Sequence, residues 1–140
     1  AKMKQADGFG RGMDLMRQIF LSAYSWFIHV EDPATIDFEA FTTAMYKRYS
    51  PYPRPEVDYL FASFGHLTDY SSNYYTYQWS LAIAKDLYTR FAANPMDAAI
   101  ARDYRTKVLA AGATKDAADL VSDFLGRPQN LDAYRAWIAE

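Results

Sequence analysis

"MDLMRQIFLSAYSWFIHV", Met13 to Val30, is the stretch that decides the fold. Its apolar residues recur at spacings of three and four, which is the period of an α-helix and not that of a strand. They form two rows, one of Met13, Met16, Phe20, Ala23, Phe27 and Val30 and the other of Leu15, Ile19 and Trp26. A helix with two apolar rows is covered on more than one side. The pattern therefore predicts a helix packed against further helices.

Similar patterns follow along the chain, separated by residues typical of helix ends. Thr35, Asn94 and Thr114 are predicted to cap later helices, because their side-chain oxygens can accept the first free N–H groups of a helix. Another helix is predicted to begin between Ser71 and Tyr74, and Gly126 in "LGRP" is predicted to end one. Since no strand-rich region occurs, the predicted fold class is all-α.

Composition narrows the classes of partner. The 140 residues are the size of one domain, and a hydrophobic fraction of 51% argues against disorder. The net charge is −2 and the basic residues are scattered, which argues against a nucleic-acid partner. No apolar run approaches the roughly 18 residues of a membrane span, so we expect no membrane partner. Because the chain has no cysteine, its composition does not distinguish a reducing from an oxidising compartment. A bacterial cytoplasm or periplasm is the expected location.

The best candidate for chemistry is "FGHLTDYSSNYYTYQW", Phe64 to Trp79, which holds one of two histidines and four of twelve tyrosines. Tyr74 and Tyr77 are three residues apart and hence neighbours on one helical face. Two phenols there can donate O–H groups to a carbonyl oxygen or a developing oxyanion. The same residues also begin an apolar stripe, so core packing is the alternative. Gly65 and the polar residues after His66 would let the preceding loop move over a ligand.

The sequence offers no metal site of its own. A catalytic zinc ion normally takes three protein ligands, and the HExxH motif that supplies two of them is absent. The two histidines, His29 and His66, are far apart in the chain. His29 lies late in an apolar helix, and we expect it to have a structural role.

Two long blocks of the chain carry a family resemblance. "FGHLTDYSSNYYTYQWS" resembles the tyrosine-rich segment near the C-terminus of the thimet-oligopeptidase family of zinc metallopeptidases. "DYRTKVLAAGATKDAADLVSDFLGRP", Asp103 to Pro128, resembles the closing pattern of these enzymes. The opening "GFGRGMDLMRQIFLSAYS" is similar to the long helix that follows their zinc-binding segment. The resemblance thus covers nearly the whole chain.

The resemblance implies a fold and a division of labour. Enzymes of this family are almost wholly helical, with two lobes around a channel that admits short peptides. Their zinc ion is held by the histidines of HExxH and a later glutamate. Because this chain lacks that motif, residues 1–140 are expected to be a single helical C-terminal segment of a larger peptidase catalytic domain. Zinc, its ligands and the general base would come from a missing upstream part, and the chain alone is expected to be inactive.

The resemblance also implies roles for individual residues. Tyr74 and Tyr77 match the pair that stabilises the oxyanion and contacts substrate, and Tyr70 and His66 match substrate-binding loop residues, with Gly65 beside them. "LTD" stands where relatives often have a longer glycine-rich link. The expected function is that of part of a zinc-dependent metallopeptidase acting on short peptides. The alternative is a self-sufficient, non-catalytic helical module that binds peptides. A fragment should expose a large apolar face, whereas a module should bury it.

Overall fold

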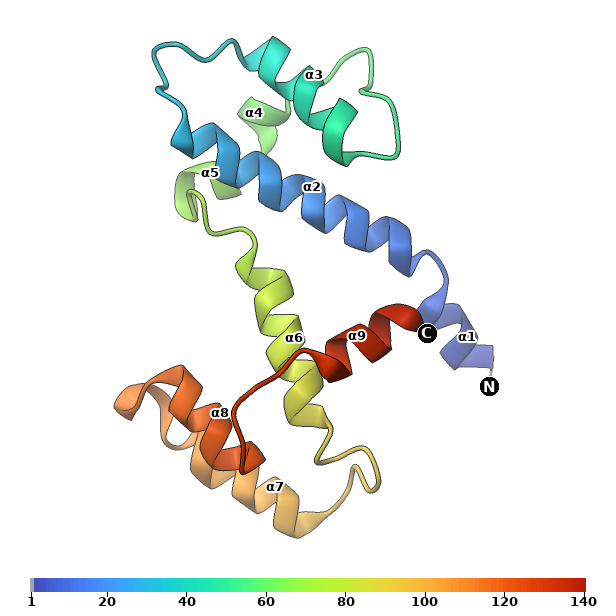
Figure 1. Cartoon of the computed structure of the whole chain (residues 1–140), viewed down its shortest axis with the longest axis vertical. Coiled ribbons are helices and arrows are strands. Elements are labelled where there is room, and N and C mark those ends of the chain that lie inside the picture. Colours follow the sequence, from blue (N-terminus) through green and yellow to red (C-terminus); the bar gives the residue numbers. More distant parts are fainter. Residues whose placement is uncertain (1) are drawn as a thin grey trace. The chain divides into compact units, whose positions relative to one another are not determined.

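The computed structural model describes residues 2–140 (Figure 1). Every regular element in this part of the chain is a helix, which confirms the predicted all-α class. The chain divides into two compact units, one ending at Gln78 and one spanning Trp79–Glu140. This division concerns packing within the chain. That residues 1–140 form one segment of a larger catalytic domain stays a prediction.

Unit 1 contains five helices and the start of a sixth. They are α1 (Lys2–Gly8), α2 (Arg11–Val30), α3 (Phe38–Tyr49), α4 (Leu60–Ser63), α5 (His66–Asp69) and the first residues of α6 (Thr76–Tyr88). The sequence predicts α2 correctly, including its end at Val30. The short helices α1, α4 and α5 were not predicted, since segments of four to seven residues show too little apolar periodicity.

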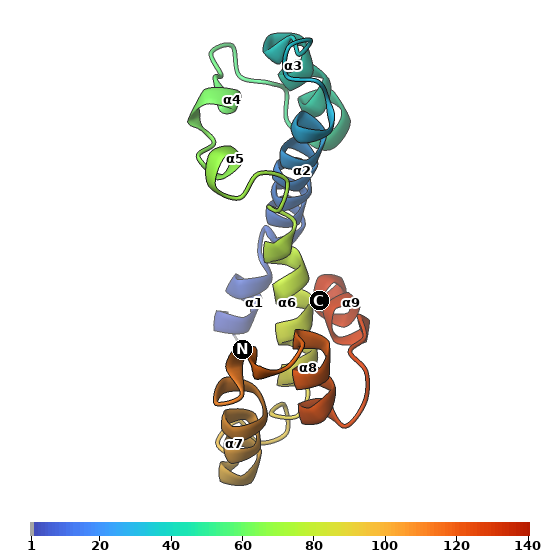
Figure 2. The same cartoon turned by 90° about the vertical axis from the view of Figure 1, so that its left-hand side faces the viewer.

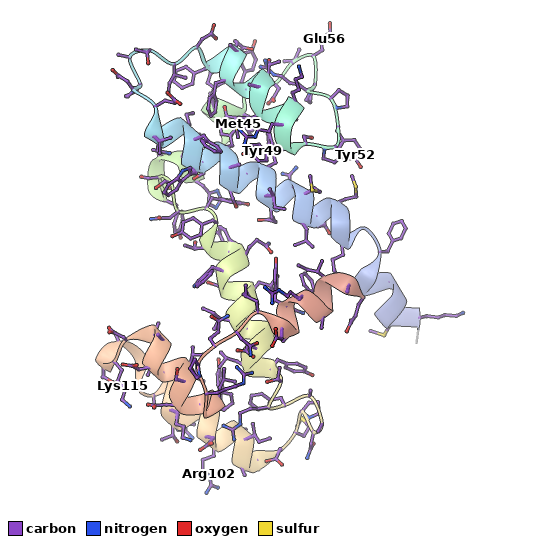
Figure 3. All side chains as sticks on the ribbon, in the orientation of Figure 1. Met45, Tyr49, Tyr52, Glu56, Arg102 and Lys115 are labelled. Atoms are coloured by element: carbon purple, nitrogen blue, oxygen red, sulfur yellow. The ribbon has the colours of Figure 1, made fainter. Side chains whose placement is uncertain are left out.

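The core of unit 1 lies along α2. Phe20, Leu21 and Tyr24 of α2 cluster with Met45 of α3 and with Tyr74. Helices α2 and α3 lie side by side in both views (Figures 1 and 2). Met45 and Tyr49 lie on the face of α3 that is turned towards α2 (Figure 3), where Tyr49 stacks on Phe27. Neither of the two apolar rows predicted for α2 is fully buried. The exposed members are Met13, Met16 and Val30 of the first row and Ile19 and Trp26 of the second.

Helix α3 starts at a different cap from the predicted one. Asp37 is the N-cap, and its side chain accepts hydrogen bonds from the backbone N–H groups of Glu39 and Ala40. The predicted cap, Thr35, lies in a turn and bonds to the carbonyl oxygen of Asp32. A carboxylate at this position also interacts favourably with the helix dipole, which favours Asp37 over the neutral hydroxyl.

Unit 2 contains most of α6, then α7 (Ala98–Tyr104), a π-helical segment (Arg105–Leu109), a 3₁₀ turn (Gly112–Thr114), α8 (Ala117–Leu125) and α9 (Asp132–Ala139). The N-cap of α7 is Asp97, not the predicted Asn94, and the N-cap of α8 is Asp116, not Thr114. The predicted end of α8 is confirmed, because Gly126 takes the left-handed conformation, with φ 70°, that closes a helix.

A buried ion pair ties α6 to the segment after α8. Asp86 of α6 is fully buried and accepts two hydrogen bonds from Arg127, at 2.5 and 3.0 Å. The backbone N–H of Asn130 donates a third at 2.9 Å. The bonds from Arg127 hold the pKa of Asp86 below its ordinary value although burial opposes them. The carboxylate is therefore charged and satisfied, as a buried charge must be.

Replacing Asp86 by asparagine should destabilise unit 2 by about 2 kcal/mol at pH 7, since the change removes a buried carboxylate that accepts charge-assisted hydrogen bonds from Arg127, whose side chain is 39% exposed. The lowered pKa sets the pH dependence. The contribution of Asp86 is complete above the pKa of an unfolded aspartate, about 3.9. It is lost as the pH falls through the lower folded-state value. The difference between the two proteins in free energy of unfolding, measured by urea denaturation, should stay constant from about pH 7 to 5 and shrink below about pH 4.

The matched control is Asp132→Asn. The side chain of Asp132 is 76% exposed and pairs with Arg135 at 3.6 Å. An exposed pair of this kind contributes little, so the loss should stay below about 0.5 kcal/mol. Equal losses for the two variants would contradict the importance assigned to the buried pair.

Candidate functional site: a histidine-centred tyrosine cluster

The segment from Gly65 to Tyr77 is a series of tight turns. His66 begins the short helix α5, where the sequence suggested a loop. Three successive backbone hydrogen bonds, Tyr70 N–H to His66, Asn73 N–H to Tyr70 and Thr76 N–H to Asn73, then lead into α6. Helix α6 begins at Thr76, after Tyr74 and not before it as predicted. Helical and turn bonds thus bring residues spread over twelve positions close together.

His66 is the centre of this arrangement. Its ring stacks on that of Tyr70 at a centroid distance of 5.6 Å, and it meets the rings of Tyr74 and Tyr77 edge-on at 5.0 and 5.8 Å. Its Nε2 lies 3.1 Å from the hydroxyl of Tyr77. We call these four residues, His66, Tyr70, Tyr74 and Tyr77, the tyrosine cluster. The structure brings together the four side chains that the sequence selected.

The members of the cluster differ in burial. Tyr74 is 8% exposed, belongs to the core and meets Phe64 edge-on at 5.1 Å. Tyr70 and Tyr77 are 53% and 48% exposed. The rings of Tyr74 and Tyr77 are 5.0 Å apart. Core packing therefore describes Tyr74, whereas the phenols of Tyr70 and Tyr77 are open to a ligand.

Gly65 is not required by the backbone conformation. Its φ and ψ angles, −55° and −27°, are those of an ordinary right-handed helical residue. A Cβ atom placed there would meet nothing within 4 Å. A larger residue would therefore fit, and any need for glycine must come from motion or from a ligand.

Two polar residues of α2 contact the same segment. The hydroxyl of Ser25 donates to the carbonyl oxygen of Ser71 at 2.6 Å. Nδ1 of His29 lies 2.7 Å from the carbonyl oxygen of Ser25, and its Nε2 lies 3.2 Å from that of Leu67. A carbonyl oxygen only accepts, and a neutral imidazole has one N–H, so a neutral His29 donates to one of these two carbonyl oxygens at a time. These contacts agree with a structural His29. Ser25 was missed, because nothing in the sequence signals a partner 46 residues away.

Tyr75 points to a different surface. It makes no ring contact with the cluster among the described residues, and it lines an apolar groove on unit 1. The other lining residues are Ile19, Ser22, Ala23, Trp26, Phe27 and Gln78. Ile19, Trp26 and Tyr75 are each about half exposed. Tyr75 therefore offers a natural comparison for the tyrosines of the cluster.

The residues of this chain do not fit a zinc site. Among the side chains that the structure describes, which are those of all residues except 1, 4, 5 and 7, no group of three or more His, Cys, Asp or Glu could hold a metal ion. His29 and His66 are instead engaged with backbone carbonyls and with Tyr77.

Among the described residues, no helix is long and apolar enough to cross a membrane.

Comparison with known proteins gives a family match over the whole chain. The model of peptidase family M3 matches residues 1–140. Saccharolysin of Saccharomyces cerevisiae is 43% identical over 75 residues, 51% of this chain and 10% of the yeast protein. The mitochondrial intermediate peptidases of Pleurotus djamor and Mycosarcoma maydis are 30% and 29% identical over 120 and 127 residues. These alignments cover 83% and 81% of this chain, and 15% and 14% of those proteins.

The chain thus spans 10% to 15% of the length of these relatives. None of the three organisms is a bacterium, so the comparisons give no support to the bacterial compartment expected from the sequence.

The difference in burial predicts different costs of truncation. Tyr74→Ala should lower the free energy of unfolding by about 3–5 kcal/mol, because it leaves a cavity in the core. Tyr77→Ala should cost about 1 kcal/mol or less, since its ring is half exposed and can be replaced by water. Urea denaturation at pH 7 measures both, with Tyr75→Ala as a half-exposed control. A Tyr77→Ala cost equal to that of Tyr74→Ala would place Tyr77 in the core as well.

Proposed function

The chain belongs to peptidase family M3, and from this premise we propose that it is the C-terminal helical part of a zinc-dependent metallopeptidase that hydrolyses short peptides. In the complete enzyme the tyrosine cluster would be the substrate-side half of the active site. The proposal is carried by one observation, the grouping of three tyrosines around His66 with the Tyr77 phenol open to solvent.

Tyr77 is proposed to donate its O–H to the scissile carbonyl oxygen as negative charge develops there. His66 is proposed to orient the Tyr77 hydroxyl for this donation. When Nε2 of His66 carries the proton, it donates to the Tyr77 oxygen, and the phenolic proton stays available for substrate. A donor held in place before reaction needs no reorganisation in the transition state, and removing one such donor costs about 3 kcal/mol.

Tyr74 and Tyr70 are proposed to complete the substrate-side surface. The ring of Tyr74 is fixed in the core and lies 5.0 Å from that of Tyr77, so it limits where the Tyr77 phenol can point. Tyr74 is therefore proposed to position the Tyr77 donor from the core. Tyr70 stacks on His66 and is half exposed, so its outer side and His66 can contact a bound peptide.

The zinc ion, its ligands and the general base are proposed to belong to another part of the complete enzyme, upstream of this chain. When bound there, the metal would supply the activated water and polarise the carbonyl. No residue of this chain is assigned to it, because its two histidines serve other contacts. The 140 residues alone are accordingly expected to have no peptidase activity.

The alternative, a self-sufficient peptide-binding module, is less well supported. A module of this kind would bury its large apolar side chains and leave only small exposed patches. In unit 1, α2 instead exposes Met13, Met16, Ile19 and Trp26. Tyr75 is exposed beside Ile19 and Trp26 in the apolar groove. Such a surface favours a chain that packs on a further part of the same enzyme.

Substituting Tyr77→Phe in the complete enzyme tests the proposed role of the phenol. The ring and its contacts remain while the O–H is lost, so kcat should fall by about 10² to 10³. Zinc content, measured by atomic absorption, should stay at the wild-type level. Tyr75→Phe, which removes an O–H from a tyrosine outside the cluster, should change kcat by less than about threefold.

Unchanged turnover of Tyr77→Phe would return this residue to a packing role. Loss of turnover together with loss of zinc would indicate a structural effect and would also count against the proposal.

Gly65→Ala tests whether the segment from Gly65 to Tyr77 must move during substrate binding. The position is open and right-handed, so alanine should keep or slightly raise the thermal stability by reducing the entropy of the unfolded chain. If the segment closes over substrate, kcat/KM should fall several-fold at unchanged melting temperature. Unaltered kinetics would mean that the segment acts as a rigid surface.

A further inference from the structure

Ser25 is a buried polar residue of unit 1 whose side chain makes one specific hydrogen bond. It lies on α2 between Tyr24 and Trp26 and is fully buried. Its hydroxyl donates to the carbonyl oxygen of Ser71 at 2.6 Å. A buried hydroxyl needs a hydrogen-bond partner. Here the partner lies in the segment from Gly65 to Tyr77, which we call the tyrosine segment, and not in the preceding turn of α2.

The residue at the other end of this bond has an unusual backbone. Ser71 has φ +50° and is the one non-glycine residue with positive φ in the described part of the chain. Side chains other than that of glycine disfavour this region, and such conformations persist only where the surroundings enforce them. The bond from Ser25 fixes the carbonyl of Ser71 and is therefore an identifiable restraint on this conformation.

The position of Ser71 explains why its conformation matters. It directly follows Tyr70, in the turn that the Asn73 N–H closes by bonding to the Tyr70 carbonyl at 2.9 Å. This turn sets the direction from Tyr70 to Tyr74, hence the placing of both rings around His66. One turn along α2, His29 contacts the carbonyl of Leu67 and restrains the start of the same segment.

We infer that Ser25 is a positioning residue of the active site, which acts by holding Ser71 in its left-handed conformation and thereby sets Tyr70 against His66. The inference rests on the proposed function of the tyrosine cluster. Ser25 itself is fully buried and touches no substrate. Its effect should therefore appear mainly in KM, which reports how well the substrate-binding side chains are placed.

The experiment uses the complete enzyme and a short peptide substrate. Ser25→Ala removes the hydroxyl, and Ser22→Ala on the same helix is the matched control, because Ser22 makes no side-chain hydrogen bond with the described residues. All variants are assayed well below their melting temperatures. We expect Ser25→Ala to raise KM about tenfold at unchanged zinc content, and Ser22→Ala to stay within about twofold of wild type.

Rescue separates positioning from general stability. Glycine takes positive φ without steric cost. Adding Ser71→Gly to Ser25→Ala should therefore bring KM back to within about threefold of wild type. A merely structural role of Ser25 would not be rescued, since a new glycine in a turn also increases the entropy of the unfolded chain. KM that stays high in the double variant would overturn the inference, as would a Ser25→Ala variant no worse than Ser22→Ala.

A second variant keeps the test independent of the core. Ser71 is exposed, and a β-branched residue strongly disfavours positive φ, so Ser71→Val should raise KM as Ser25→Ala does while leaving α2 intact. Wild-type KM for Ser71→Val would overturn the inference. Tyr77→Phe, assayed in parallel, distinguishes the two proposals. If it lowers kcat while Ser25→Ala matches Ser22→Ala, only the positioning role fails; if it has no effect, the proposed function fails.

Discussion

Helix α2 buries two hydroxyl groups together with its apolar side chains, and each hydroxyl must find a partner in the interior. The hydroxyl of Thr42 donates to the carbonyl of Phe38 at 2.6 Å, so Tyr24 must be the donor in its 2.8 Å bond to Thr42. The hydroxyl of Ser25 donates to the carbonyl oxygen of Ser71, which lies in the segment from Gly65 to Tyr77. These bonds specify one alignment of α3 and one of the tyrosine segment on α2. Apolar contacts alone would permit several similar alignments.

This constraint explains how a site can combine rigidity with access. Tyr74 lies in the core, so the cluster has a fixed base. His66, Tyr70 and Tyr77 are placed against it by ring contacts and by the bond between His66 and Tyr77. Burial lowers the mobility of one phenol, while exposure leaves the others free to meet a ligand. Tyr74 and Tyr77, three residues apart, thus differ in burial, because one lies in the core and the other is half exposed.

The sequence predicted the features that depend on local spacing. The apolar period of α2, the glycine end of α8 and the closeness of Tyr74 to Tyr77 all follow from residues a few positions apart. The N-caps were predicted less well. Near α3, α7 and α8, a Thr or Asn that can cap stands two or three residues before the Asp that is the N-cap, and spacing alone does not choose between them. Spacing also placed Tyr74 beside Tyr77, whereas His66 and Tyr70 were selected through the family resemblance. The anchors of the site, Ser25 and His29, were not predictable, because their partners lie 46 and 38 residues away.

The long-range anchors also bear on why the tyrosine segment carries serine and not glycine at position 71. Glycine would adopt the left-handed conformation without help, but it would leave the segment free to adopt others as well. Serine disfavours it, and the Ser25 bond restrains the Ser71 carbonyl, so the proposed positioning role would link the geometry of the cluster to the packing of α2. With that role, a displacement of α2 would reach Tyr70 through the hydrogen bond between Ser25 and Ser71.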